Sequence, residues 1–169
     1  MTVRAAAPAD ARAIAGVQTR SWRAAYVGVV PQPVLDGLSV DRSEHGWTRM
    51  LADGDQPVVV AEADGVVVGF AAVGRSRDEG AAGTAGELRA LYVDPDAWRR
   101  GLGRALLAEA ERVLRERGFV DAMLWVLRDN ARGRAFYASA GWTPTGATTT
   151  LDMAGTPVEE VQYRRVLQA

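Results

Sequence analysis

Two glycines and three arginines stand together where a predicted strand, at residues 88–93, passes into a predicted helix. The glycines are Gly101 and Gly103, and the arginines around them are Arg99, Arg100 and Arg104. The first turn of a helix exposes unpaired N–H groups and a partial positive charge, and both attract phosphate. Glycine lets the backbone approach a ligand closely, and arginine donates paired hydrogen bonds to phosphate oxygens. The cluster therefore predicts a loop that binds pyrophosphate.

Two common phosphate-binding loops do not fit these positions. The P-loop of nucleoside triphosphatases requires a lysine, and the 20 basic residues of this chain are all arginines. The dinucleotide-binding pattern G-x-G-x-x-G/A fits Gly101 and Gly103, but Leu106 stands where a third small residue is needed. Taken alone, the stretch is also compatible with an arginine-rich loop before an ordinary helix.

A third pattern fits both this stretch and a second one downstream. Residues 100–105, RGLGRA, match R-x-x-G-x-A, and residues 130–142, NARGRAFYASAGW, follow N-x-x-A-x-x-F-Y-x-x-x-G-F. Gly133 replaces the alanine of the second pattern, and Trp142 replaces its last phenylalanine. In this order the two segments resemble the signatures of the GCN5-related N-acetyltransferase (GNAT) family. The resemblance is close over residues 57–167 and loose before them.

The resemblance implies an α/β (α+β) fold with a mixed, mostly antiparallel sheet of about seven strands and helices on both faces. It also implies acetyl-CoA as the acetyl donor, with direct transfer to an amine. The strand that ends at Val93 would separate from the strand at 123–127 and hold the pantetheine arm in the gap. The implied cofactor-binding residues are Leu91, Tyr92, Val93, Arg99, Arg100, Gly101, Leu102, Gly103, Arg104, Asn130 and Tyr137.

Tyr137 is the candidate general acid, because the departing CoA thiolate needs a proton that a phenol can give. Packing against Phe136 is its structural alternative. Glu87, just before the strand at 88–93, is the candidate base, with a solvated glutamate or a water chain as alternatives. His45 has suitable chemistry but lies in the loosely matched region. Asn130 is either a helix cap, a ligand of the pantetheine arm, or both.

The acceptor pocket is predicted from aromatic residues. Trp22 and Tyr26 stand four residues apart and would share one face of a helix. Tyr92 would point away from Leu91 and Val93 into the same cavity. An aromatic wall favours a cation or a flat apolar group, so we expect a small primary amine, with Glu87 and Asp36 as the nearby negative charges. The alternative for the first two aromatic residues is simple packing of the helix onto the sheet.

Two other functions stay open at this point. A protein N-terminal acetyltransferase would use the same donor with a peptide acceptor. A non-catalytic acyl-CoA-binding module would keep the donor site without turnover.

The composition of the chain predicts its domain organisation, its partners and its compartment. The chain has 169 residues, 48% of them hydrophobic and 24% charged, which predicts a single globular domain over residues 1–169. It has no cysteine and one histidine, so neither a disulfide nor a metal site is expected. A net charge of −1 predicts no nucleic-acid or membrane partner. The charged N-terminal stretch lacks the apolar core of a secretory signal, so we expect a cytoplasmic protein. A homodimer is left open.

The rest of the sequence pattern predicts the order of the strands, helices and turns. Asp64-Gly65 marks a tight hairpin turn, and residues 75–86 are expected to form a surface loop. A third helix is expected to be capped by Asp41 or Ser43, and a final hairpin to turn at residues 154–157. Strands are predicted at 2–6, 57–63, 66–74, 88–93, 121–127, 148–153 and 161–166, and helices beginning near residues 8, 31, 41–43, 101 and 130.

Overall fold

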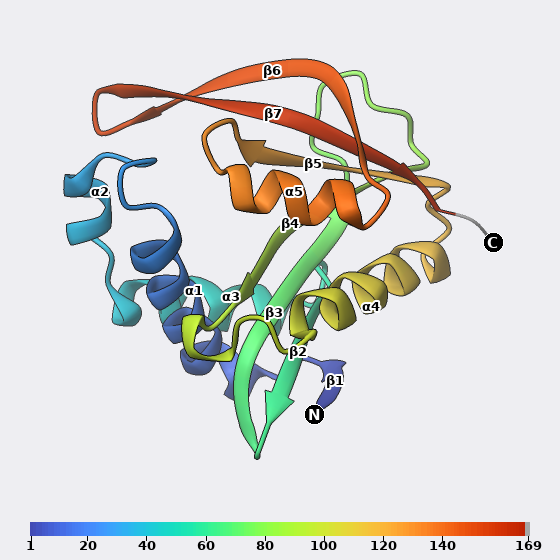
Figure 1. The fold of residues 1–169 in the computed structure, drawn as a ribbon. Helices are drawn as coiled ribbons and strands as arrows, with labels where there is room; N and C mark the ends of the chain where they lie inside the picture. Colours follow the sequence, from blue (N-terminus) through green and yellow to red (C-terminus); the bar gives the residue numbers. More distant parts are fainter. Residues whose placement is uncertain (168–169) are drawn as a thin grey trace.

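The computed structural model describes residues 1–167. The strands are β1 (Thr2–Ala5), β2 (Val58–Ala63), β3 (Val66–Arg75), β4 (Ala85–Val93), β5 (Asp121–Leu127), β6 (Thr143–Met153) and β7 (Thr156–Val166). They form one sheet in the order β1-β2-β3-β4-β5-β7-β6 (Figure 1). Among the strands of residues 1–167, only β4 and β5 pair in parallel. The predicted mixed, mostly antiparallel sheet of seven strands is therefore confirmed.

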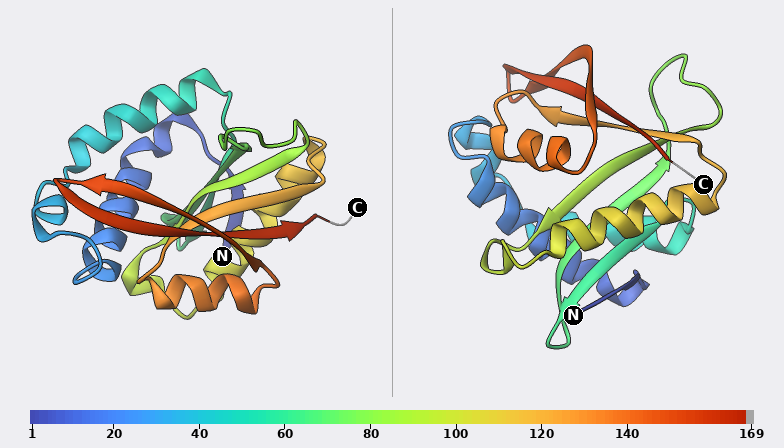
Figure 2. Two further views of the ribbon diagram at one scale, coloured as in Figure 1. Left: turned by 90° about the horizontal axis from the view of Figure 1, so that it is seen from above. Right: turned by 45° about the vertical axis from the view of Figure 1, so that its right-hand side comes forward.

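Helices cover both faces of this sheet (Figures 1 and 2). They are α1 (Ala11–Ala25), α2 (Gln32–Asp36), α3 (Val40–Asp53), α4 (Leu102–Glu116) and α5 (Ala131–Ser139), with short 3-10 turns at Pro8–Asp10 and Pro95–Ala97. Within residues 1–167, no helix combines the length and the apolar character that crossing a lipid bilayer requires.

Two apolar layers hold the helices to the sheet. On one face, Ile14 of α1 and Trp47 of α3 pack against Phe70 of β3. On the other face, Leu106 of α4 belongs to a cluster that also contains Trp142, which follows α5. α1 and α4 each bury one apolar stripe, as the period of their sequences predicts. The two layers leave the gap beside β4 as the place where a ligand can enter the sheet.

The two hairpin turns follow local sequence rules. Asp64 and Gly65 have φ angles of 53° and 77°, the left-handed pair that a two-residue turn of this type requires. Ala154 and Gly155 repeat this geometry, with φ of 53° and 80°. The final turn is thus shorter than predicted, because β7 already begins at Thr156.

Several predicted boundaries were wrong. β6 begins at Thr143 and β7 at Thr156, whereas the predicted strands began at 148 and 161. The third helix begins earlier than expected, because Ser39 in extended conformation is its cap and accepts a hydrogen bond from the Arg42 N–H. Glu87 lies inside β4 and not before it. β4 begins at Ala85, and in its pairing with β3 Gly86 lies opposite Arg75. The loop before β4 is therefore shorter than predicted. A Cβ at Gly86 would lie 2.8 Å from Leu114 of α4, so glycine here allows close packing and does not mark a loop.

Strands β4 and β5 separate soon after they meet. Their pairing covers only three residue pairs and ends where Glu87 lies opposite Met123. In β4, Arg89 is an extra residue, because Val73 of β3 lies opposite Leu88 while Ala72 lies opposite Ala90. Such a bulge bends and twists a strand. The expected separation of the two strands is therefore present, and it opens the middle of the sheet.

Candidate active site

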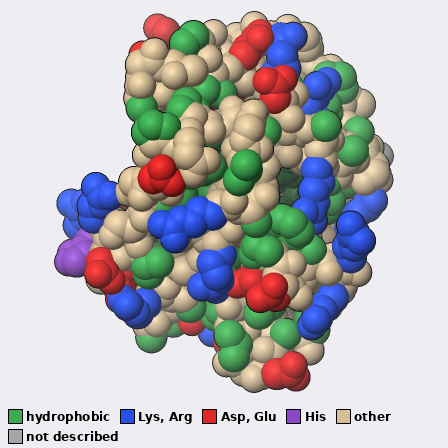
Figure 3. Space-filling model, turned by 60° about the vertical axis from the view of Figure 1, so that its left-hand side comes forward, with side chains coloured by type: hydrophobic (Ala, Val, Ile, Leu, Met, Phe, Trp, Pro, Cys, Tyr) green, Lys and Arg blue, Asp and Glu red, His purple; other side chains and the backbone are tan. Residues whose placement is uncertain are grey.

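The gap between β4 and β5 opens into a cavity of about 590 Å³. Figure 3 shows a hollow on this face of the molecule, bordered by hydrophobic and basic side chains. The lining comes from α1, β4, the loop before α4, the first turn of α4, β5, α5, β6 and β7. Of the site residues predicted from the sequence, all line this cavity except Arg100 and Glu87.

The loop before α4 is held in an unusual backbone conformation. Arg99 and Gly101 both have positive φ angles, 64° and 79°, and Gly101 is the N-cap of α4. The side chain of Asp94 begins the loop by accepting a hydrogen bond from the Asp96 N–H at 3.2 Å, and Arg20 binds Asp94 at 2.7 Å. The first turn of α4 is thereby placed beside the cavity, as the phosphate-loop prediction requires.

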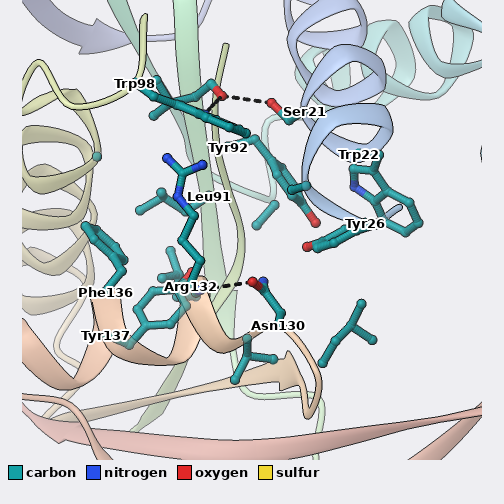
Figure 4. Close-up of a pocket in the computed structure, with 18 of the residues that line it drawn as sticks. Ser21, Trp22, Tyr26, Leu91, Tyr92, Trp98, Asn130, Arg132, Phe136 and Tyr137 are labelled. Atoms are coloured by element: carbon teal, nitrogen blue, oxygen red, sulfur yellow. Dashed lines mark hydrogen bonds between the residues drawn. The ribbon is translucent and has the colours of Figure 1, made fainter. Parts of the chain in front are cut away.

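Three arginines face this end of the cavity. Arg99 and Arg104 are two of them, and Arg104 also donates to the carbonyl and hydroxyl of Ser139. The third is Arg132 on α5, whose guanidinium lies 3.5 Å from the ring centroid of Trp98 (Figure 4). Burial, with the nearby charge of Arg99, lowers the pKa of Arg132. A guanidinium stacked on an aromatic ring at the edge of a cavity is well placed to bind an anion.

The backbone of β4 presents hydrogen-bonding groups to the gap. The Asp94 N–H donates to the Val68 carbonyl of β3 at 2.8 Å. Backbone groups alternate in direction along an antiparallel pair, so those of Leu91 and Val93 point away from β3. The Val93 carbonyl already accepts from the Ser21 hydroxyl at 2.9 Å and the Trp98 indole at 2.7 Å (Figure 4). The Leu91 groups and the Val93 N–H are thus directed at the gap.

Tyr137 lies on α5 at the floor of the cavity (Figure 4). Its ring packs edge-on against Phe136, with 5.2 Å between ring centroids. Burial raises the pKa of the Tyr137 phenol, and the neighbouring Tyr92 raises it further. The hydroxyl is therefore protonated throughout the neutral range, which is the state a proton donor needs. Packing and proton donation are compatible in this position.

Asn130 caps α5 and also lines the cavity. Its Oδ1 accepts a hydrogen bond from the Gly133 N–H at 2.9 Å. A Cβ at position 133 would lie 2.5 Å from the Asn130 amide nitrogen, so glycine gives this side chain its room. The cap uses Oδ1 alone, and the amide nitrogen can still serve a ligand.

Aromatic side chains form the opposite end of the cavity. The rings of Trp22 and Tyr26 meet edge-on at 5.0 Å, although α1 ends at Ala25, just before the tyrosine. Tyr92 lies 6.4 Å from Trp22, and its hydroxyl faces that of Tyr26 (Figure 4). Burial raises the pKa of both phenols. The predicted grouping of these three residues is present in the structure.

The two candidate bases, Glu87 and His45, lie outside the cavity lining, and so does Asp36, the second predicted negative charge. Glu87 is only 3% exposed and holds Arg77 at 2.6 Å. His45 is exposed on α3, with its Nδ1 2.6 Å from the Asp41 carbonyl. Asp36 is exposed at the end of α2. Glu87 is thus paired with Arg77 and does not line the cavity, and its role as base stays a prediction.

The cavity residues that the sequence did not single out include Trp98, Arg132 and Glu160. Arg132 occupies a variable position of the second signature, and its place in the first turn of α5 is the signal that could have marked it. Glu160 lies in β7, where alternation fixes its face but not what that face borders.

A model of the acetyltransferase (GNAT) family matches residues 20–142 of the chain. The chain belongs to the GNAT family. An uncharacterised N-acetyltransferase of Bacillus subtilis (strain 168), YuaI, is 35% identical over 95% of this chain and 90% of its own length. A spermidine N(1)-acetyltransferase of Thermoplasma acidophilum is 25% identical over 79% of this chain and 82% of its own length.

Solved structures show the same fold for this GNAT enzyme. The ribosomal-protein-alanine N-acetyltransferase of Brucella melitensis superposes with a TM-score of 0.78 at 26% identity, over 99% of this chain and all of its own. The protein yncA of Salmonella typhimurium, solved with its cofactor acetyl-CoA, gives a TM-score of 0.75 at 25% identity, over 100% and 95% of the two chains. The enzyme is an acyltransferase with acetyl-CoA as its donor, so a purely non-catalytic module is no longer favoured.

Proposed function

We propose that this GNAT enzyme transfers the acetyl group of acetyl-CoA directly to a small primary amine with an apolar or aromatic body. The observation that carries the proposal is the aromatic end of the cavity, where Trp22, Tyr26 and Tyr92 enclose one region beside the gap in the sheet. Such a wall suits a cationic group on an apolar frame. The relative named as a spermidine acetyltransferase adds support for a small amine acceptor.

The other end of the cavity fits the donor. Acetyl-CoA supplies an acetyl group activated as a thioester. Arg99, Arg104 and Arg132, together with the first turn of α4, would hold its pyrophosphate by charge-assisted hydrogen bonds. The Leu91 and Val93 backbone would pair with the pantetheine arm in the gap, and Asn130 would add a bond from its amide. An N–H of β4 directed at the acetyl carbonyl would stabilise the negative charge that develops on its oxygen.

Tyr137 would protonate the sulfur as it leaves. Its protonated phenol lies in the same cavity as the β4 backbone. The chain has no cysteine to form an acyl-enzyme, so we propose direct attack by the amine within a ternary complex. The acceptor nitrogen would approach from the aromatic end.

A protein N-terminal amine is the second candidate acceptor. The solved relative from Brucella melitensis is named as a ribosomal-protein-alanine N-acetyltransferase. A free N-terminus is also a primary amine, so the donor site and Tyr137 would serve both reactions. The two reactions differ in the acceptor that the aromatic end of the cavity must hold, a small amine in one and the N-terminus of a protein in the other.

Replacing Tyr26 with alanine tests the acceptor pocket. Loss of one buried ring from the wall is expected to lower kcat/KM for the best small amine by about ten- to a hundredfold, the effect of about 1.5–3 kcal/mol of apolar contact. The KM for acetyl-CoA should stay within error of wild type. Steady-state kinetics with each substrate varied in turn give both values.

The matched control for this substitution is Leu35→Ala. Leu35 is buried in the same apolar cluster as Tyr26 but does not line the cavity, so it reports the cost of loosened packing alone. A Tyr26→Ala enzyme with unchanged amine kinetics would contradict the pocket. An equal loss of amine kinetics in both variants would contradict it too.

A further inference from the structure

Glu160 is, within residues 1–167, the single acidic side chain that lines the cavity. It comes from β7, opposite Leu127 of β5. Val158, two residues before it and therefore on the same face of the strand, packs in the cluster that contains Tyr26 and Leu127. Glu160 is thus directed to the aromatic end of the cavity and away from the arginines of the donor end.

The carboxylate of Glu160 has no partner in the described part of the chain. Its neighbour Glu159 binds Arg128 on the other face of β7, and Glu87 binds Arg77. Glu160 is half-buried, and within residues 1–167 no side-chain hydrogen bond or ion pair reaches its carboxylate, although its backbone pairs in the sheet. Partial burial of an unpaired carboxylate costs stability. A residue kept at such a cost, facing a cavity, is a candidate for function.

The groups around Glu160 come from three parts of the chain. Tyr26 follows α1, Tyr92 and Glu87 come from β4, and Arg77 belongs to the loop before β4; each interacts electrostatically with Glu160. Arg89 of the β4 bulge lines the same cavity. Burial raises the pKa of the Glu160 carboxyl, the charge of Glu87 raises it further, and Arg77 opposes the shift.

We infer that Glu160 binds the ammonium group of the acceptor and then takes its proton. The inference rests on the proposed function, since it assigns the base for that reaction. A cation at this end of the cavity would contact aromatic faces on one side and one free carboxylate on the other. Glu160 would therefore select a protonated amine as the acceptor by its charge. By removing one proton, it would also convert that amine into the nucleophile.

The protons balance as follows. One N–H bond of the ammonium breaks and an O–H bond forms on Glu160, which leaves a neutral amine and later gives this proton to water. The amine nitrogen bonds to the acetyl carbon, and the bond from that carbon to sulfur breaks. Tyr137 gives its phenolic proton to the sulfur and regains a proton from the nitrogen, which becomes an amide.

The test compares Glu160→Gln with Glu159→Gln, the same change one residue earlier on the opposite face. The acceptor is the best substrate among 2-phenylethylamine, tryptamine and spermidine. At pH 7 we expect kcat/KM for the amine to fall by about a hundredfold in Glu160→Gln, within the usual range for one general base. The KM for acetyl-CoA should not change. Glu159→Gln should match wild type in both values.

The pH profile separates a base from a structural residue. Wild-type kcat/KM should rise with pH as the Glu160 carboxyl ionises. In Glu160→Gln this rise of kcat/KM with pH should be absent. Its kcat/KM should approach that of wild type only at alkaline pH, where neutral amine is abundant. Calorimetric titration of the amine into the protein should show weaker binding to Glu160→Gln. Because the folded-state pKa of this acid is raised, it lowers stability as pH rises, so the glutamine variant should melt no lower than wild type at neutral pH.

The outcomes distinguish this inference from the proposed function. Wild-type turnover with an unchanged rate and pH profile in Glu160→Gln overturns the role of Glu160 and leaves the proposed function standing. A melting temperature well below wild type, with amine kinetics lost equally at all pH values, also overturns it, because that result marks a structural residue. If wild type acetylates none of the three amines, the proposed function fails and Glu160 loses its role with it.

Discussion

Replacing Tyr137 with phenylalanine is expected to lower kcat by roughly ten- to a thousandfold, near the range for one general acid, with acetyl-CoA affinity nearly unchanged. The leaving sulfur would then have to take its proton from water. The phenylalanine ring keeps the packing against Phe136 and Trp142, so the protein should fold as before. Because the pKa of the phenol is raised, wild-type kcat should not fall for lack of this proton below about pH 10.

A matched control is Tyr163→Phe. Tyr163 is a buried tyrosine of β7 that does not line the cavity, so its hydroxyl can be removed without touching the proposed chemistry. Its kcat should equal that of wild type. Full turnover by Tyr137→Phe across the pH range would leave Tyr137 as a packing residue, and the proton would have to come from elsewhere.

Replacing Arg132 with glutamate is expected to weaken acetyl-CoA binding by about ten- to a hundredfold or more. A hydrogen bond to a charged group contributes about 1.5–3 kcal/mol, and the reversed charge adds repulsion. The guanidinium lies over Trp98 at the donor end of the cavity, where a phosphate group would meet it. Calorimetric titration with acetyl-CoA measures the dissociation constant directly.

Arg100→Glu is the control for this charge reversal. Arg100 is exposed and lies outside the cavity lining, so its reversal should weaken binding much less than that of Arg132. Equal losses in the two variants would show that only the general charge of the region matters. A larger loss in Arg100→Glu would restore the prediction made from the sequence, which placed Arg100 at the pyrophosphate.

Local rules explain which parts of the fold could be read from the sequence. Asn130 was predicted as a helix cap, and the Asp64-Gly65 turn was predicted from the backbone angles its residues prefer. The start of β4 was missed because Ala85 and Gly86 have little preference for strands. Pairing with β3 and close packing by α4 place them in the sheet, and neither contact is visible in a local pattern.

The cavity was predictable where the two signatures run and less so elsewhere. The glycines and arginines before α4 lie in a continuous motif, so their grouping needed no knowledge of the fold. To predict that Glu160 lines the cavity, three facts are needed together: that β4 and β5 separate, that β7 lies beside β5, and which face of β7 borders the gap. The ion pair of Glu87 with Arg77 could not be predicted for a similar reason, because Arg77 belongs to a loop that has no recognisable pattern.

The most direct test of the central claim is a competition between two acceptors in one reaction. Wild-type protein is incubated with acetyl-CoA and equal concentrations of a small primary amine, such as 2-phenylethylamine, and a short peptide with an N-terminal alanine. Mass spectrometry identifies the acetylated products, and free CoA is measured in parallel. The account predicts that the N-acetylated small amine forms in an amount equal to the CoA released. Acetylation of the peptide alone, or release of CoA without any acetylated amine, would contradict it.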